Sequence, residues 1–296
     1  MTSSRDLVPI SPRPELPFEE RVGALESAFS GRLGYHALHL DSGEELFLRP
    51  DEVFPTASVI KLGLVCALLE VVSRGEASLD EVVPLPPPEW RVAGGGVLKQ
   101  LDVESLTLRD LVELTVCVSD NVAANVIHER CGGSTAVNAY LAGLGLVATL
   151  MHGPIDFSRI THDVDGGIGV STPRDQTRLL TLLQRDEMLT PELCKYLRGV
   201  LGRQHLLDQL PRWLGWNTYA QYHRKPWPLW VGSKSGELDG IRADVGIVRS
   251  EAGGTAVLAV FTDGSRDLRE TIDVEGALTV AECSAAICAR LLGLEC

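Results

Sequence analysis

Ser58 is followed three residues later by Lys61, and no other serine of the chain has a lysine at that offset. The largely apolar run 62–69 comes next and predicts a buried helix. Positions i and i+3 share a helix face, so the Ser58 hydroxyl and the Lys61 amine can meet at the N-terminus of that helix. A serine becomes a nucleophile when a base takes its proton, and lysine can be that base once burial or another cation lowers its pKa. The same two residues also fit a helix cap followed by an ordinary lysine.

Two short motifs further along the chain give this pair a context. Ser119-Asp120-Asn121 lies between two expected helices, and Lys234-Ser235-Gly236 ends an expected strand. Each motif alone also fits a structural role, because Ser-Asp-Asn caps helices well and Lys-Ser-Gly suits a strand end. Taken in this order, the three match the Ser-x-x-Lys, Ser-Asp-Asn and Lys-Thr-Gly set of class A β-lactamases and penicillin-binding proteins. Ser235 keeps the hydroxyl of the usual threonine.

The chain therefore resembles the class A β-lactamases and their serine-hydrolase relatives, from about Glu19 to Leu292. Further similar segments are residues 54–58, 106–111, 119–125, 171–175 and 240–248. The resemblance implies that Ser58 attacks a carbonyl to form an acyl-enzyme and that Lys61 activates it or relays its proton. Ser119 would pass a proton to the leaving nitrogen.

The resemblance also implies a set of substrate-binding groups. Asn121 would bind the amide of the substrate's side chain, and the backbone N–H groups of Ser58 and Glu237 would form the oxyanion hole. Lys234 and Ser235 would bind the substrate carboxylate. Arg242 lies near the position of a carboxylate-binding arginine, although it is one residue out of the family's register.

The chain departs from the family at the residue that hydrolyses the acyl-enzyme. Class A β-lactamases carry a glutamate in a Glu-x-x-Leu-Asn pattern of the omega loop, and residues 147–170 contain no such pattern. Simple alignment places Pro154 at the position of the glutamate. Asp156 is the candidate replacement base, with His152 and His162 as further candidates, although each also fits a solvated loop residue. We therefore expect acylation with slow deacylation.

The elements that must position these motifs predict a mixed α and β fold. Their order is a helix over residues 15–30, strands over 33–40 and 44–48, helices within 56–214, strands over 229–233, 243–248 and 256–261, and a helix over 278–292. Short connections indicate antiparallel strands. Thr107 is expected to form a capping box with Asp110 at the start of one helix, and Ser134 is expected to cap a later one. We expect one antiparallel sheet of about five strands, flanked by the N- and C-terminal helices and interrupted by an all-helical domain.

The expected domain bounds follow from this order. Residues 1–18 form a flexible N-terminal segment, residues 19–55 plus 215–296 a sheet domain, and residues 56–214 a helical domain. The active site is expected at the junction of the two domains. An aromatic segment, residues 213–230, contains four of the five tryptophans, and Trp90 is the fifth. This segment either binds a ligand or covers the sheet edge.

Composition limits the partners. A net charge of −13 argues against nucleic acid and anionic membranes. No apolar stretch reaches the roughly 18 residues of a membrane helix, and the N-terminus lacks the layout of a secretory signal. We expect a cytoplasmic protein, or a periplasmic or secreted one if a leader has been removed. The seven scattered cysteines fit buried small side chains rather than disulfides or a zinc site. No metal or cofactor is implied, and a monomer that acts on a small molecule is the default.

Alternative functions stay open at this stage. The favoured function is hydrolysis of a β-lactam amide through Ser58. A DD-peptidase, amidase or esterase of the same fold is the second, and a penicillin-binding protein that stays acylated is the third. The lack of an export signal favours a substrate other than an antibiotic, and the missing glutamate favours the penicillin-binding protein.

Overall fold

The computed structural model describes residues 16–156, 167–219 and 228–296. Its centre is a sheet of five strands in the order β2-β1-β10-β9-β8, with all neighbours antiparallel. The strands are β1 (Arg32–His39), β2 (Glu45–Leu48), β8 (Leu229–Leu238), β9 (Ile241–Ser250) and β10 (Gly254–Asp263). The predicted antiparallel sheet is confirmed, and its last three strands are longer than the apolar runs that indicated them.

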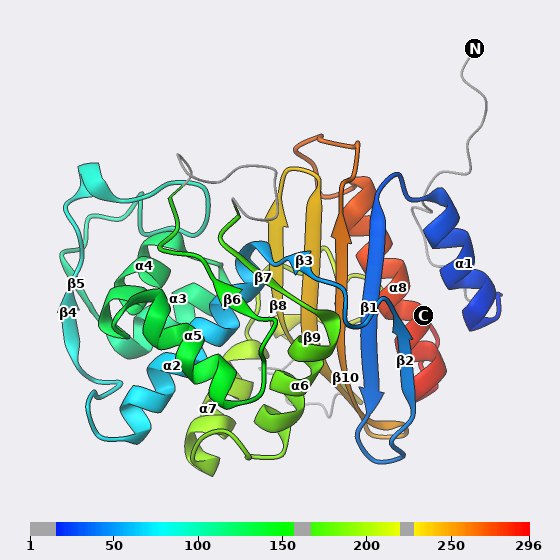
Figure 1. Ribbon diagram of the computed structural model, residues 1–296, viewed down its shortest axis with the longest axis horizontal. Coiled ribbons are helices and arrows are strands. Elements are labelled where there is room, and N and C mark those ends of the chain that lie inside the picture. Colours follow the sequence, from blue (N-terminus) through cyan, green and yellow to red (C-terminus); the bar gives the residue numbers. More distant parts are fainter. Residues whose placement is uncertain (1–15, 157–166, 220–227) are drawn as a thin grey trace.

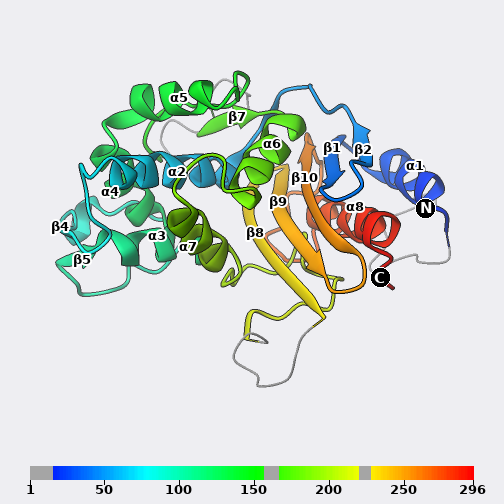
Figure 2. The ribbon, with the colours of Figure 1, turned by 90° about the horizontal axis from the view of Figure 1, so that it is seen from below.

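Each face of the sheet packs against its own layer of helices. Side chains of a strand alternate between the two faces, so Val257, Ala259 and Phe261 join one apolar cluster while Leu258 and Val260 join another. Helices α1 (Phe18–Ala28) and α8 (Glu275–Leu292) cover the second face (Figures 1 and 2). Helix α6 (Pro173–Gln184) packs against β1, β9 and β10 on the first.

The remaining long helices gather beside the sheet (Figure 1). They are α2 (Ile60–Ser73), α3 (Leu108–Cys117), α4 (Asn121–Arg130), α5 (Gly133–Gly143) and α7 (Pro191–Leu201). Helix α2 contacts α3, α4 and α5, and it is buried along most of its length because its sequence is apolar on every face. Lys61 is thereby held in the protein interior. The division into a sheet domain and a helical domain stays a prediction.

Several short elements complete the fold. The two-residue strands β3 (Phe54–Pro55) and β6 (Leu150–Met151) flank β7 (Gly169–Ser171) in a small sheet, and β4 (Val82–Pro84) pairs with β5 (Ser105–Thr107). Single helical turns occur at η1 (Ala57–Val59) and η2 (Pro88–Trp90). In the described ranges, no helix combines the length and the apolar character needed to cross a bilayer.

The helix ends test the predicted caps. Thr107 and Asp110 form the expected capping box at the start of α3. The prediction that Ser134 caps α5 is wrong, since the cap residue is Gly132 with φ +85°. Glycine tolerates this left-handed conformation, and the Ser134 hydroxyl instead contacts Nε2 of His128 at 2.9 Å. Helix α8 begins at Glu275, earlier than its apolar pattern indicated.

Candidate active site

The backbone around Ser58 is held in an uncommon conformation. Ser58 lies in η1, directly before α2, and Ala57 before it has φ +43°. Ser119 in the loop between α3 and α4 has φ +55°. A left-handed conformation of a non-glycine residue costs roughly 1–3 kcal/mol and persists only where its surroundings impose it. One strained position directly precedes Ser58, and the other is the first residue of the Ser-Asp-Asn motif.

Strand β8 passes directly against the turn that carries Ser58. A Cβ atom on Gly236 would lie 2.5 Å from the carbonyl oxygen of Thr56 and 3.0 Å from the backbone nitrogen of Ser58. Only glycine allows this approach. The third residue of the Lys-Ser-Gly motif is therefore required by packing, and it brings Ser58 and Glu237 to one pocket.

Lys61 is fully buried and bonds to the Ser-Asp-Asn motif. Its Nζ donates to the carbonyl oxygen of Ser119 at 2.6 Å, to Ser119 Oγ at 3.2 Å and to Asn121 Oδ1 at 2.6 Å. Within the described chain, the hydrogen-bond partners of Lys61 Nζ do not include Ser58. Ser58 and Lys61 lie at the start of α2, as the spacing predicted, but the Lys61 amine is held in place by Ser119 and Asn121. The spacing of Ser58 and Lys61 alone does not reveal these contacts.

Lys234 approaches the same hydroxyl from the sheet. Its buried Nζ donates to Ser119 Oγ at 3.1 Å and to the carbonyl oxygen of Ser235 at 2.6 Å. Burial and the nearby Lys234 hold the pKa of Lys61 well below its usual range, although Asp120 acts in the opposite direction. Burial lowers the pKa of Lys234 to about 8, opposed by Asp244. At neutral pH, Lys234 therefore carries the charge, and the lowered pKa of Lys61 makes its neutral form, which a general base requires, more accessible than in an exposed lysine.

The Asp120 side chain holds the backbone of the loop at residues 97–98 against the start of α4. Its buried carboxylate caps α4 through the N–H of Ala123 and accepts the N–H groups of Val97 and Leu98 at 2.6 and 2.8 Å. A Cβ atom on Gly96 would lie 2.1 Å from the Asp120 carboxylate. In the sequence, glycines 94–96 fit a plain turn, which does not by itself reveal the close approach of Gly96 to Asp120. Three successive glycines ahead of a Ser-Asp-Asn motif are the signal that could have indicated it.

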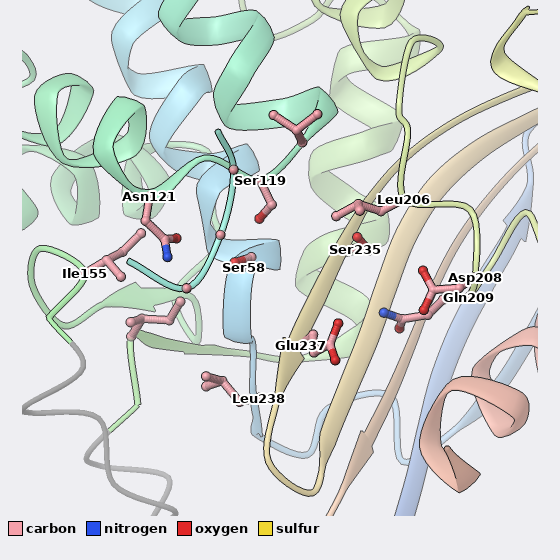
Figure 3. A pocket seen from close by; sticks show the side chains of 15 residues that line it. Ser58, Ser119, Asn121, Ile155, Leu206, Asp208, Gln209, Ser235, Glu237 and Leu238 are labelled. Carbon is pink, nitrogen blue, oxygen red and sulfur yellow. The ribbon is translucent and has the colours of Figure 1, made fainter. Parts of the chain in front are cut away.

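The motifs meet at a pocket with a volume of about 290 Å³ (Figure 3). Its described lining consists of Ser58, Gly94, Gly95, Gly96, Val118, Ser119, Asn121, Ile155, Ile168, Leu206, Asp208, Gln209, Ser235, Glu237 and Leu238. Five expected site residues are among them, and Lys61 and Lys234 lie buried behind Ser119. The structure therefore brings together all the expected site residues except Arg242 and Asp156.

Arg242 does not line the pocket. The register of β8 and β9 pairs it with Glu237, at the end of the hairpin. Its guanidinium donates to the carbonyl oxygens of Leu238 and Ile241 at 2.7 and 2.8 Å and to Glu237 Oε1 at 2.7 Å. These bonds hold the guanidinium at the hairpin, against Glu237 and Leu238, which line the pocket although Arg242 itself does not.

An isoleucine occupies the side of the pocket where a deacylating base was expected. Asn125 binds the backbone of Ile155 on both sides, with its Nδ2 on the carbonyl oxygen at 3.0 Å and its Oδ1 on the N–H at 2.7 Å. This fixes Ile155 at the pocket, so the residue found there is Ile155 and not its neighbour Pro154. Asp156 does not line the pocket, and exposed His152 bonds to the carbonyl oxygen of Gly167 at 3.0 Å. His162 lies outside the described residues.

The aromatic segment contributes no described residue to the pocket lining. Trp216 is buried in the apolar cluster under α8, and the ring of Trp230 lies 3.8 Å from the guanidinium of Arg249. These two tryptophans therefore pack as a cover. Trp90 is 77% exposed and does not line the pocket either. Tyr222, His223 and Trp227 lie outside the described residues.

Comparisons with known proteins place this site in a family. The family model described as the β-lactamase enzyme family matches residues 17–291. β-Lactamase L2 of Stenotrophomonas maltophilia is 36% identical over 122 residues, 41% of this chain and 40% of the relative. A β-lactamase of Proteus vulgaris is 26% identical over 261 residues, 86% of this chain and 82% of the relative. The chain spans about 40% of the length of the first curated relatives that it matches.

Solved structures give the same result for the fold. A β-lactamase from Sphaerobacter thermophilus has a TM-score of 0.81 at 27% identity, with 94% of this chain and 97% of that chain covered. The structure of PBP-A has a TM-score of 0.79 at 24% identity, with 96% and 100% covered, and it supports the fold alone. The extent of the family match, together with the shared fold, shows that this chain belongs to the β-lactamase enzyme family.

Proposed function

We propose that this protein is a serine hydrolase that opens a β-lactam amide through an acyl-enzyme on Ser58 and releases the acyl group slowly. The observation that carries the proposal is the position of Ser119 Oγ. It lies within hydrogen-bond distance of both Lys61 Nζ and Lys234 Nζ, in a pocket that also exposes Ser58. This arrangement can move one proton from a nucleophile to a leaving group.

The acylation step then balances as follows. Neutral Lys61 takes the proton of Ser58, and the Ser58 oxygen bonds to the substrate carbonyl carbon. The carbonyl oxygen becomes an oxyanion that the backbone N–H groups of Ser58 and Glu237 stabilise. When the C–N bond breaks, Ser119 gives its proton to the leaving nitrogen and recovers one from Lys61. Charged Lys234 keeps the potential around Ser119 positive throughout.

Deacylation lacks an evident base in the described part of the site. A hydrolytic water needs a proton acceptor near the acyl carbon, and the pocket presents the side chains of Ile155 and Ile168 on that side. Ile155 is 2% exposed and fixed by Asn125. We therefore expect the acyl-enzyme to accumulate, as it would in a penicillin-binding protein.

Intact-protein mass spectrometry after mixing with a penicillin tests the proposal. We expect an adduct of one whole penicillin that forms on the wild type, is absent from Ser58→Ala and persists after free penicillin is removed. A transient adduct with accumulating product would support efficient β-lactam hydrolysis and direct attention to Asp156. No adduct at all would refute β-lactam acylation and favour a peptidase, amidase or esterase.

We also propose that the protein is a monomer, and light scattering during size-exclusion chromatography tests this oligomeric state.

A further inference from the structure

One side of the pocket is rich in hydrogen-bond acceptors and negative charge. Asp208, Gln209 and Glu237 lie together there, near Ser235 (Figure 3), and we call these three residues the acidic wall. Asp208 and Glu237 are the charged residues of the described lining, and both are acidic. The ion pairs found in the described chain leave the Asp208 carboxylate without a partner.

Gln209 adds an acceptor that the described protein does not satisfy. Its side chain is 1% exposed and lines the pocket, and its Nε2 donates to the carbonyl oxygen of Gly236 at 3.3 Å. Its Oε1 is buried and has no hydrogen-bond partner among the described residues. A buried carbonyl oxygen without a donor is unfavourable, so a ligand N–H group that the Gln209 side chain can turn to meet at this wall is favoured.

Neither of the two cations that the family resemblance assigned to a substrate carboxylate lines the pocket, and only Arg242 pairs with an acid of the wall. Lys234 is fully buried, and its Nζ is engaged by Ser119 and the carbonyl oxygen of Ser235. Arg242 pairs with Glu237 at 2.7 Å but lies outside the lining, and the Glu237 side chain stays 62% exposed. An anionic group placed beside the wall would face the Asp208 carboxylate at short range, together with the Glu237 carboxylate, whose charge Arg242 partly offsets.

The position of the wall indicates which half of a substrate reaches it. Ser119 supplies the proton to the leaving atom, and Ser119 Oγ is bonded to Lys234, the residue that precedes Ser235 on β8. We therefore expect the leaving group beside Ser119 and Ser235, next to the acidic wall. Asn121, on the side of Lys61, is left to the acyl half.

We propose that the acidic wall is a subsite for a cationic group, so that the preferred substrates of Ser58 carry an ammonium or similar charge on the leaving half. This inference rests on the proposed acylation of Ser58 and names the substrate class of the same site. A penicillin, whose carboxylate lies on the leaving half, then serves as a reactive probe rather than as the preferred substrate.

Three thioesters of phenylacetic acid, whose leaving thiols are similar in shape and differ in charge, test the subsite. The thiols are 2-(dimethylamino)ethanethiol (cationic when protonated, with one N–H), 3-methylbutane-1-thiol (its neutral isostere) and 3-mercaptopropionate (anionic). Calorimetric titration of Ser58→Ala with each compound measures binding without chemistry, and mass spectrometry of the wild type measures the rate of Ser58 acylation. We expect the cationic compound to bind and acylate about tenfold better than the neutral one, as two partly exposed ion pairs allow. The anionic compound should be the poorest.

The two arms separate the subsite from the catalytic proposal. Tighter binding of the cation to Ser58→Ala without acylation of the wild type would uphold the subsite and refute acyl transfer through Ser58. Acylation at equal rates by the three compounds, with equal binding, would refute the subsite and leave the proposed function intact. Failure of all three compounds to bind would also refute the subsite.

Neutral variants of the wall assign the preference to its residues. Asp208→Asn and Glu237→Gln should each lower the ratio of cationic to neutral binding about threefold, in line with the loss of one partly exposed ion pair. Asp239→Asn is the matched control, because Asp239 is an exposed acid in the same hairpin that does not line the pocket. An equal loss of preference in Asp239→Asn would assign the effect to overall charge and overturn the subsite. The preference should also fall as salt is added, since these carboxylates are partly exposed.

Discussion

Replacing Gly236 with alanine should disable acylation while leaving the protein folded. The added Cβ atom would lie 2.5 Å from the carbonyl oxygen of Thr56 and 3.0 Å from the nitrogens of Ser58 and Val59, all backbone atoms that cannot rotate away. Restoring ordinary contact requires β8 and η1 to separate by roughly 1 Å. A displacement of about 1 Å at a reacting centre can cost around 100-fold in rate, and loss of one oxyanion donor costs about 100- to 1000-fold.

The rate of adduct formation with a penicillin, followed by rapid quench and mass spectrometry, measures this effect. We expect Gly236→Ala to acylate at least about 100-fold more slowly than the wild type, with overpacking lowering the free energy of unfolding by about 1–3 kcal/mol. Gly23→Ala is the control, because a Cβ atom at this exposed position of α1 meets no atom within 4 Å. It should acylate normally and gain about 0.5–1 kcal/mol of stability. Acylation by a folded Gly236→Ala within threefold of the wild type would refute the argument that this close approach builds the oxyanion hole.

Three further predictions concern Ile155 in the pocket lining, the proton transfer through the two lysines, and the loop that Asp120 holds. Ile155→Glu places a carboxylate, which can act as a general base for the hydrolytic water, where Asn125 fixes the backbone against the pocket. The lifetime of the penicillin adduct should therefore shorten at least about tenfold. An unchanged lifetime would contradict this geometry. The rate of acylation should rise with pH as Lys61 loses its proton, and it should fall near pH 8 as Lys234 loses its own proton. Arginine stays charged at this pH, so a Lys234→Arg variant whose acylation rate still falls near pH 8 would contradict the assignment of this fall to Lys234. Asp120→Ala removes the acceptor of three backbone N–H groups, so the free energy of unfolding measured by urea titration should fall by about 3 kcal/mol. A loss of less than about 1 kcal/mol would show that water replaces the carboxylate as the acceptor.

The large elements could be predicted from sequence because each has its own physical signature. The strand β10 alternates side chains between two apolar clusters, and α2 is apolar on every face, so both are evident from residue patterns. The strands β3, β6 and β7 escaped prediction because two or three residues carry no periodicity. The start of α5 escaped because Gly132, rather than a side-chain acceptor, forms its cap.

The site was predictable where a motif is contiguous and unpredictable where two segments meet. Ser119, Asp120 and Asn121 are consecutive residues where the loop after α3 meets the start of α4, so one motif locates all three. Arg242 depends on the register of the β8–β9 hairpin, and one residue of register decides whether a side chain faces the pocket. Ile155 depends on its contact with Asn125, thirty residues away in sequence. Neither the register nor that contact can be read from residue order alone.

The two lysines explain why the acyl-transfer centre can be complete although the pocket walls differ. Ser119 Oγ has one proton to donate and two lone pairs, and both lysines lie within reach of it. Two charged lysines would both donate to Ser119, and Lys61 could then accept no proton from Ser58. Burial and Lys234 hold the pKa of Lys61 well below that of an exposed lysine, so in the proposed mechanism the proton passes from Ser58 to Lys61 and then through Ser119 to the leaving atom. This proposed path uses no side chain of the acidic wall and none at Ile155, so we expect these side chains to set the preferred substrate and the acyl-enzyme lifetime, while Ser58, Lys61 and Ser119 form the acyl-enzyme.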